Sequence, residues 1–300
     1  MIKEENMETI KKLTENKKKI GKLFKFDWKV QIILIVVLLL VLFPFYIMMV
    51  TTIETFEETN NAEFVWWPAN GPTFDAYDTV MKGTIGGISL MGSLWNTIWI
   101  YLPGVLVGLL TSTMAAFAFA KLNFRLKNFL FAFLMATMMM PNVMSMMSKF
   151  LIFDAIGWIN TPWPLMIPRM FGSMGIIFFI KQYLMGLPDD MLNAAKIDGA
   201  GNWGILFNII IPVAKPVIVA QFVLGFISAY NDYTEPLLYL QDANMYTLQI
   251  GLAFFYDPYT QNWPQRMAGC AVTMIPLIIL YLLSQKYILE GMAVSASLKG

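Results

Sequence analysis

DDMLNAAKIDGAGNWGILFNIIIP, residues 189–212, is a polar insert between two apolar stretches that are each long enough to cross a lipid bilayer. Two acids open the insert, alanines stand at its centre, and glycines follow. Acidic side chains favour the N-cap and first turn of a helix, and glycine favours the left-handed residue that ends one. The pattern therefore predicts a short helix with Asp189 and Asp190 as its N-cap and first-turn acids. Gly199 is expected to end this helix, and a second helix is expected from Asn202.

The rest of the chain has the composition of a membrane protein. Of its 300 residues, 57% are hydrophobic and 14% are charged, and the mean hydropathy is +0.59. Soluble domains carry about 25% charged residues. The apolar residues of this chain also occur in long blocks, as transmembrane helices require. We therefore expect an all-α membrane protein with one helical membrane domain.

Six apolar blocks have the length of a transmembrane helix, which needs about 20 residues to cross a hydrocarbon core of about 30 Å. They cover residues 30–53, 95–120, 128–147, 164–184, 209–230 and 267–289. The first block is longer than the apolar region of a signal peptide, about 7–15 residues, so we expect an uncleaved helix. Gly104 and Gly108 have the GxxxG spacing that lets helices approach closely. Pro212 predicts a bend where the insert enters the fifth block.

Positive charges predict the orientation of the six helices. Most of the 21 Lys and Arg residues fall in segments that a cytoplasmic N-terminus places inside, and four fall outside: Lys82, Lys149, Arg169 and Arg266. Because positively charged loops stay in the cytoplasm, we expect both termini and the insert there. The predicted organisation is a cytoplasmic tail (1–29), a first transmembrane helix (30–53), an extracytoplasmic loop (54–94), a membrane domain (95–290) with a cytoplasmic loop (186–208), and a cytoplasmic tail (291–300).

The chemistry that the chain lacks argues against several functions. It has no histidine, the commonest metal ligand and general base, and one cysteine, Cys270, which cannot form an internal disulfide. No GxxxxGK[ST] phosphate loop occurs, and the net charge of +1 gives no reason to expect a nucleic-acid partner. We therefore expect no catalytic residue, no bound metal and no cofactor on this chain.

The predicted helix of the insert is a poor match to a helix that lies on lipid. Such a helix is cationic and has large apolar residues on one face, whereas this one begins with acids and has alanines at its centre. Met191, Ala194, Ala195 and Asp198 share one helical face. Small side chains there would let the backbone of another protein come close, so we expect a protein partner in the cytoplasm.

The insert resembles the EAA motif, E-A-A-x3-G-x9-I-x-L-P, of the permease subunits of ABC importers. The residues that match it are Ala194, Ala195, Gly199, Ile209, Ile211 and Pro212. Asn193 stands where the motif usually has glutamate, and Ile211 replaces its leucine. The resemblance covers residues 30–300 and is to the maltose-permease-like, CUT1-type subunits for carbohydrates. It is also carried by SLWNTIWIY (93–101), YNDYTEPLLYL (230–240) and QKYILEGMAVSASLKG (285–300).

The resemblance implies a type I importer permease fold with six transmembrane helices, in the cell membrane of a prokaryote. The helix of the motif would be a coupling helix that docks on a cytoplasmic ABC ATPase dimer, which binds ATP and Mg. Further expected partners are an extracytoplasmic solute-binding protein and a second permease subunit, either a different chain, which is favoured, or a second copy of this one. The residues expected to serve ATPase coupling are Asp190, Asn193, Ala194, Ala195, Asp198, Gly199 and Pro212. Alanine at Gly199, or a bulky residue at Ala195, should lower transport without blocking membrane insertion.

A path for carbohydrate needs hydrogen-bonding side chains and aromatic faces. Such residues follow the fifth apolar block, and a charge inside a transmembrane helix indicates a functional residue. The candidates are Tyr230, Asn231, Asp232, Tyr233, Glu235 and Arg169. Two other interpretations stay open. The first five residues could form a structural turn at the membrane surface, and Arg169 could extend to that surface from the outer end of its helix.

The sequence favours an importer subunit for a carbohydrate such as an oligosaccharide. The same machine could carry a polyol or a glycerol-phosphate, although a phosphate would favour several basic residues in the path. An ion-coupled secondary transporter would need carboxylates buried in the membrane, and few acids lie in the predicted spans. A membrane scaffold would leave the cytoplasmic helix without a role.

Overall fold

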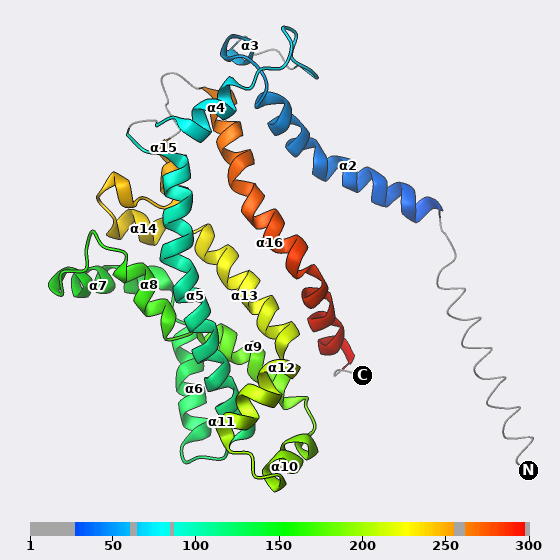
Figure 1. Cartoon of the computed structure of the whole chain (residues 1–300), viewed down its shortest axis with the longest axis vertical. Coiled ribbons are helices and arrows are strands. Elements are labelled where there is room, and N and C mark those ends of the chain that lie inside the picture. The colour runs from blue at the N-terminus through cyan, green and yellow to red at the C-terminus, as the bar shows by residue number, and fades with distance from the viewer. Residues whose placement is uncertain (1–27, 61–64, 85–86, 255–261, 298–300) are drawn as a thin grey trace, which may run out of the picture. The chain divides into compact units, whose positions relative to one another are not determined.

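A computed structural model describes residues 28–60, 65–84, 87–254 and 262–297, with the side chains given up to Ile288. Most of the predicted tail 1–29 and the last residues of the tail 291–300 lie outside these ranges. The described residues form helices and connecting turns, with no β-strand among them (Figure 1). The chain divides into two compact units, residues 1–50 and 51–300, which are described separately.

The first unit consists of helix α2 (Trp28–Thr51), which matches the first predicted span. Its side chains are apolar on every side and mostly exposed; Leu40, for example, is 69% exposed. A helix that is apolar all round is stable in lipid rather than in water. Pro44 lies inside α2 without ending it. The prediction of an apolar helix long enough to span the membrane is therefore confirmed.

The second unit is organised around one long helix, α5 (Leu90–Lys121). Helices α8, α9 and α13 pack against α5, and α16 packs against α13 (Figure 1). The other elements, in chain order, are α3 (Phe56–Asn60), α4 (Asp75–Lys82), α6 (Lys127–Met138), α7 (Asn142–Ala155), α8 (Trp163–Met170), α9 (Met174–Met185), α10 (Asp189–Ile197), α11 (Asn202–Ile205), the π-helix η1 (Leu206–Ile210), α12 (Ile211–Val213), α13 (Lys215–Tyr230), α14 (Thr234–Tyr239), the 3-10 helix η2 (Ala243–Met245), α15 (Leu248–Phe254) and α16 (Trp263–Ser297).

The described residues contain four helical stretches that are long and apolar enough to cross a membrane: α2, α5, the stretch Trp163–Met185, and Trp263–Ile288 within α16. Two bent pairs bring the number to six if each counts as one span. The third predicted span, residues 128–147, coincides with one of these bent pairs, because α6 and α7 meet at 95°. Pro141 lies at this break, where it lacks an N–H for a continuous helix and disfavours helical geometry in the residue before it.

The bend predicted for the start of the fifth span is present. The segment Asn202–Val213 and helix α13 meet at 77°. Pro212 lies just before this break, and Pro216 occupies the first turn of α13. The π-helix η1 widens the backbone immediately upstream, so the chain enters α13 through an irregular segment.

The GxxxG pair of α5 permits a close helix contact, as predicted. Gly104 and Gly108 are buried against the backbone of α8 and the turn that follows it. A Cβ atom on Gly104 would lie 3.0 Å from the Met166 carbonyl oxygen, and one on Gly108 would collide with the Arg169 carbonyl oxygen. Only glycine therefore lets α8 approach α5 this closely.

We predict that Gly108→Ala destabilises the protein by about 1–3 kcal/mol, because its methyl group would force α8 away from α5. Thermal unfolding of the purified protein, followed by tryptophan fluorescence, measures this change. Gly225→Ala on α13 is the matched control, since its added Cβ would meet only Val105 Cγ1, at 3.7 Å. Equal melting temperatures for the two variants would contradict the packing argument.

Candidate functional site

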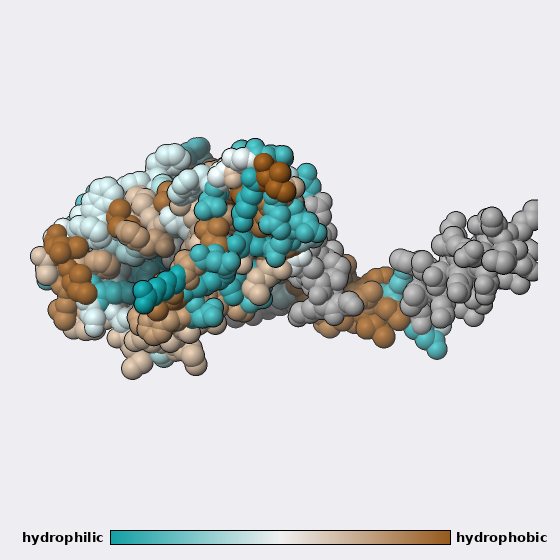
Figure 2. All heavy atoms as spheres, turned by 90° about the horizontal axis from the view of Figure 1, so that it is seen from below, coloured by the Kyte–Doolittle hydropathy of each residue, from teal (hydrophilic) through white to brown (hydrophobic). Residues whose placement is uncertain are grey.

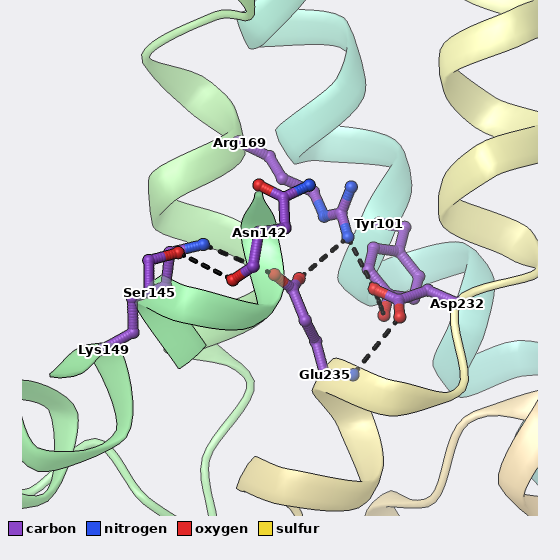
Figure 3. A network of polar contacts seen from close by, with 7 residues as sticks. All are labelled: Tyr101, Asn142, Ser145, Lys149, Arg169, Asp232 and Glu235. Atoms are coloured by element: carbon purple, nitrogen blue, oxygen red, sulfur yellow. Dashed lines mark hydrogen bonds and ion pairs between the residues drawn. The ribbon is translucent and has the colours of Figure 1, made fainter. Parts of the chain in front are cut away.

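Arg169 lies at the end of α8 and points inward, towards two carboxylates. Its guanidinium donates hydrogen bonds to Asp232 Oδ2 at 2.7 Å and to Glu235 Oε2 at 3.1 Å (Figure 3). It also stacks on the ring of Tyr101 from α5, 4.8 Å from the ring centre. The interpretation of Arg169 as a side chain that extends to the membrane surface is therefore wrong. The close approach of α8 to α5 directs it into the helix bundle, where a cation needs a partner.

The turn after α8 fixes this arginine in place. Gly172 has a φ of +86°, which favours glycine, and the α5 hydroxyls bind the backbone around it. Thr111 donates a hydrogen bond to the Met170 carbonyl oxygen at 2.9 Å, and Ser112 accepts one from the Ser173 N–H at 3.1 Å. The break between α8 and α9 is thus held by two side chains of α5.

Asp232 has each carboxylate oxygen occupied. Besides Arg169, its Oδ2 accepts a hydrogen bond from the Tyr101 hydroxyl at 3.2 Å, and its Oδ1 accepts one from the Glu235 N–H at 3.3 Å (Figure 3). It stands between α13 and α14, so these contacts also fix the turn between the two helices. Its side chain is 14% exposed.

Lys149 joins this group from α7, and sequence reasoning did not select it. Its Nζ atom lies 3.7 Å from Glu235 Oε1, and the two side chains are 39% and 30% exposed (Figure 3). The signal available in the sequence was a lysine among the methionines and large apolar residues of α7. In the sequence, Lys149 served only to predict the orientation of the helices. That use does not show which carboxylate the lysine contacts in the folded protein.

These charged residues border a cavity of about 850 Å³, within the range of about 300–1,000 Å³ that is usual for small-molecule sites. Two cations and two carboxylates face each other there, so their formal charges cancel. Other lining side chains are Asn142, Phe153, Ser228, Thr234 and Tyr239. Two buried polar atoms, Arg169 Nε and Tyr239 Oη, make no hydrogen bond to any described residue.

The other predicted path residues lie elsewhere. Tyr230 is 2% exposed and donates a hydrogen bond to the Thr273 carbonyl oxygen at 2.7 Å, so it belongs to the core between α13 and α16. Asn231 binds the Ile227 carbonyl oxygen and Gln249, and Tyr233 is 42% exposed. None of these three residues lines the cavity. Their neighbours Asp232 and Glu235 do, because the turn between α13 and α14 points different side chains in different directions.

We predict that Arg169→Met destabilises the protein by about 2 kcal/mol, because it leaves Asp232 without its cation and Glu235 with only the more distant Lys149. Thermal unfolding of the purified protein measures the loss. Lys82→Met is the control; its ion pair with Asp78 is far more exposed, at 78% and 64%, and its loss should cost less than about 0.5 kcal/mol. Similar melting temperatures for both variants would show that the inward-facing charges do not hold the helices together.

A second candidate site is α10, at the opposite end of the unit from α4 (Figure 1). The prediction that Asp189 caps this helix needs correction: Pro188 holds the N-cap position, and no side chain caps it. Asp189 and Asp190 lie in the first turn, as the second part of the prediction states. The Asp189 carboxylate instead accepts a hydrogen bond from Lys121 at 2.6 Å. The end of the helix is as predicted, since α10 stops at Ile197 and Gly199 has a φ of +84°.

Lys121 ties α10 to the last turn of α5. Its side chain is only 6% exposed, and its Nζ also donates a hydrogen bond to the Leu187 carbonyl oxygen at 2.7 Å. The Lys121 hydrogen bond and charge lower the pKa of Asp189 below its usual range. A buried cation thus links the start of α10 to the helix that carries Tyr101.

The two central alanines of α10 differ in exposure, because adjacent residues on a helix point about 100° apart. Ala195 and Leu192 are buried in a core with α5, α9 and η1, whereas Asn193 and Ala194 are exposed. Ile197 is 87% exposed at the end of the same helix. The prediction that Ala195 presents a small exposed side chain therefore needs correction; of the two alanines, only Ala194 is exposed. Figure 2 looks onto this end of the unit, where hydrophilic residues cover much of the centre and isolated hydrophobic residues stand among them.

The Asp189–Lys121 pair predicts a pH dependence of stability. A carboxylate whose folded-state pKa is lowered stabilises the fold above its unfolded pKa, about 3.9, and loses this effect as the pH falls through the folded value. We expect Asp189→Asn to lower the melting temperature equally at pH 7 and pH 5. The difference from the unsubstituted protein should shrink below about pH 4. A difference that already disappears at pH 6, or persists unchanged at pH 3, would contradict this assignment.

The described part of the chain contains no cluster of three or more His, Cys, Asp or Glu residues that could hold a metal ion. These residues therefore provide no candidate metal site.

Comparison with known proteins identifies relatives over most of the chain. The family described as "Binding-protein-dependent transport system inner membrane component" matches residues 104–294. An arabinooligosaccharides transport system permease from Halalkalibacterium halodurans is 32% identical over 231 residues, which cover 75% of this chain and 82% of the relative. An sn-glycerol-3-phosphate transport system permease from Pectobacterium atrosepticum is 29% identical and covers 87% and 94% of the two chains.

Solved structures contain the same fold. A bacterial ABC transporter involved in the import of the acidic polysaccharide alginate has a chain that superposes with a TM-score of 0.77, covering 88% of this chain and 96% of that one. The sequences are 22% identical, so the likeness concerns the fold. It confirms the predicted fold class, an all-α membrane protein with the architecture of an ABC importer permease.

Proposed function

Because the chain belongs to the family of binding-protein-dependent transport system inner membrane components, we propose that it translocates a neutral carbohydrate, most simply an oligosaccharide. Proteins of this family are multi-pass subunits of the inner membrane, and the relatives are permease subunits rather than enzymes.

The charge balance of the cavity carries the proposal. Arg169 and Lys149 are both directed at carboxylates, so neither offers an uncompensated positive charge. A phosphate ester would add negative charge beside Asp232 and Glu235, whereas a polyhydroxyl solute adds none and can donate to carboxylates and accept from cations. Relatives named for arabinooligosaccharides and lactose support this choice. Relatives named for sn-glycerol-3-phosphate keep that solute as the second candidate.

The partners proposed for this chain follow from the family. Two cytoplasmic ABC ATPase subunits would bind ATP and Mg, an extracytoplasmic binding protein would deliver the solute, and a different permease subunit would complete the membrane path. We keep the predicted segments, with both termini and residues 186–208 in the cytoplasm and residues 54–94 outside. An ion-coupled secondary transporter is disfavoured by membership of a binding-protein-dependent family.

We propose that α10 docks on the ATPase through its exposed side. Asp190, Asn193 and Ala194 are exposed, while Leu192 and Ala195 anchor the helix to the membrane domain. Gly199 would end α10, and Pro212 would mark the bend after the loop, where the chain enters α13. Asn193 is neutral where the EAA motif has glutamate, so we expect it to contact the ATPase by hydrogen bonds alone.

We predict that Ala194→Trp lowers solute-stimulated ATP hydrolysis at least tenfold without lowering the melting temperature, because the indole would hold the ATPase away from α10. Ala195→Trp is the informative comparison. Its indole would enter the core and lower the free energy of unfolding by roughly 1–3 kcal/mol, so this variant should also have a lower melting temperature. Full stimulation in an Ala194→Trp complex would contradict docking on this side.

The solute assignment is tested with the complete complex in lipid vesicles. The binding protein is loaded with arabinotriose, lactose or sn-glycerol-3-phosphate, and ATP hydrolysis and uptake are measured. We expect stimulation by at least one neutral sugar and none by the phosphate ester. Stimulation by sn-glycerol-3-phosphate alone would overturn the carbohydrate assignment. Uptake driven by an ion gradient without ATP would overturn the proposed mode of transport.

A further inference from the structure

The two cations of the cavity are held in different ways. Arg169 makes hydrogen bonds of 2.7 and 3.1 Å to Asp232 and Glu235, and its ring contact with Tyr101 encloses it further. Lys149 Nζ lies 3.7 Å from its carboxylate and makes no hydrogen bond to another described residue. Because direct bonds between an ammonium and a carboxylate span about 2.7–2.9 Å, this pair is too far apart to be hydrogen-bonded.

We propose that Lys149 and Glu235 form a hydroxyl-binding pair in the cavity, and that Arg169 and Asp232 position Glu235 without meeting the solute. This inference rests on the proposed carbohydrate function and assigns part of the solute contact to this chain. A single sugar hydroxyl fits the chemistry, since it can accept a hydrogen bond from Nζ and donate one to Glu235 Oε1.

The other contacts of Glu235 hold its side chain in the orientation that such a hydroxyl contact requires. Its Oε2 atom is bound by Arg169, and its N–H is bound by Asp232 Oδ1, so the side chain cannot turn freely. Its Oε1 atom makes no hydrogen bond to another described residue and faces Lys149 (Figure 3). A preorganised acceptor loses little conformational freedom when a solute binds, which favours affinity.

The surroundings of the pair also suit a sugar. Asn142 and Ser228 line the same cavity and offer neutral donors and acceptors. The rings of Phe153 and Tyr239 meet edge to face, 5.3 Å apart, and form an apolar wall. Tyr239 Oη is buried, lacks a partner among the described residues and belongs to a side chain that lines the cavity. A ligand hydroxyl would supply the missing partner once the neighbouring side chains shift to admit it.

Protection from chemical modification tests the assignment. Thr234→Cys is introduced into the complete transporter together with Cys270→Ser, so that a maleimide reagent labels this chain only inside the cavity. Arabinotriose, lactose and sn-glycerol-3-phosphate are the probes, and the concentration that halves the labelling rate is measured. We expect at least one of the two sugars to protect the Thr234→Cys variant from labelling, and we expect sn-glycerol-3-phosphate not to protect it.

In that background, Lys149→Met and Glu235→Gln should each raise the half-protecting sugar concentration at least tenfold. Lys149→Arg, which keeps a cationic donor, should stay within threefold. Lys82→Met is the matched control, because it also removes a lysine from an ion pair, with Asp78, but outside the cavity. It should leave the half-protecting concentration unchanged.

The double variant Lys149→Met/Glu235→Gln separates binding from structure. If the pair only balanced charge within the fold, removing both charges together would restore protection. We expect protection to stay at least tenfold weaker, since both hydroxyl contacts are lost. Restored protection in the double variant, unchanged protection in both single variants, or no protection by either sugar would overturn the inference.

Measurements of ATP hydrolysis on the same complex separate failure of the Lys149–Glu235 assignment from failure of the proposed carbohydrate function. If a sugar-loaded binding protein stimulates ATP hydrolysis but neither sugar protects the Thr234→Cys variant, the carbohydrate function stands and the solute contact belongs to another subunit. If no sugar-loaded binding protein stimulates ATP hydrolysis, the proposed function itself falls.

Discussion

The close contact between α5 and α8 is the constraint on which the rest of the candidate site depends. Gly104 and Gly108 let the α8 backbone lie directly on α5, and this contact turns Arg169 into the helix bundle. A guanidinium there requires anionic partners, because an unpaired charge away from water costs several kcal/mol. Asp232 and Glu235 supply them and thereby join α8 to the turn between α13 and α14.

Helix α5 also connects the two candidate sites. Tyr101 contacts the charged group of the cavity, and Lys121 holds the start of α10. Their separation of twenty positions corresponds to about 30 Å of helix, close to the thickness of a bilayer core. A single rigid element therefore touches both the proposed solute cavity and the proposed ATPase-docking helix. The packing of Leu192 and Ala195 adds a second, apolar attachment between α10 and the membrane domain.

Much of the architecture could be predicted because it depends on local patterns. The long apolar blocks predict the transmembrane helices, and the EAA-like spacing predicts a helix that ends before Gly199. The sequence by itself does not decide whether a proline bends its helix. Pro44 is accommodated within α2, whereas Pro141 lies at a 95° break. A proline only removes one backbone hydrogen bond and adds a clash, and neighbouring packing decides whether the helix continues.

The sequence by itself determined the membrane class, the family resemblance, the position of α10 and three charged residues of the site, because composition, spacing and a charge in an apolar segment are visible one segment at a time. Only the tertiary structure decided that Lys149 and Tyr101 join them, that Tyr230 does not, and that Ala194 rather than Ala195 is exposed. These facts depend on which helix faces which. That choice is made by contacts between residues far apart in the chain, such as the one between Gly108 and Arg169.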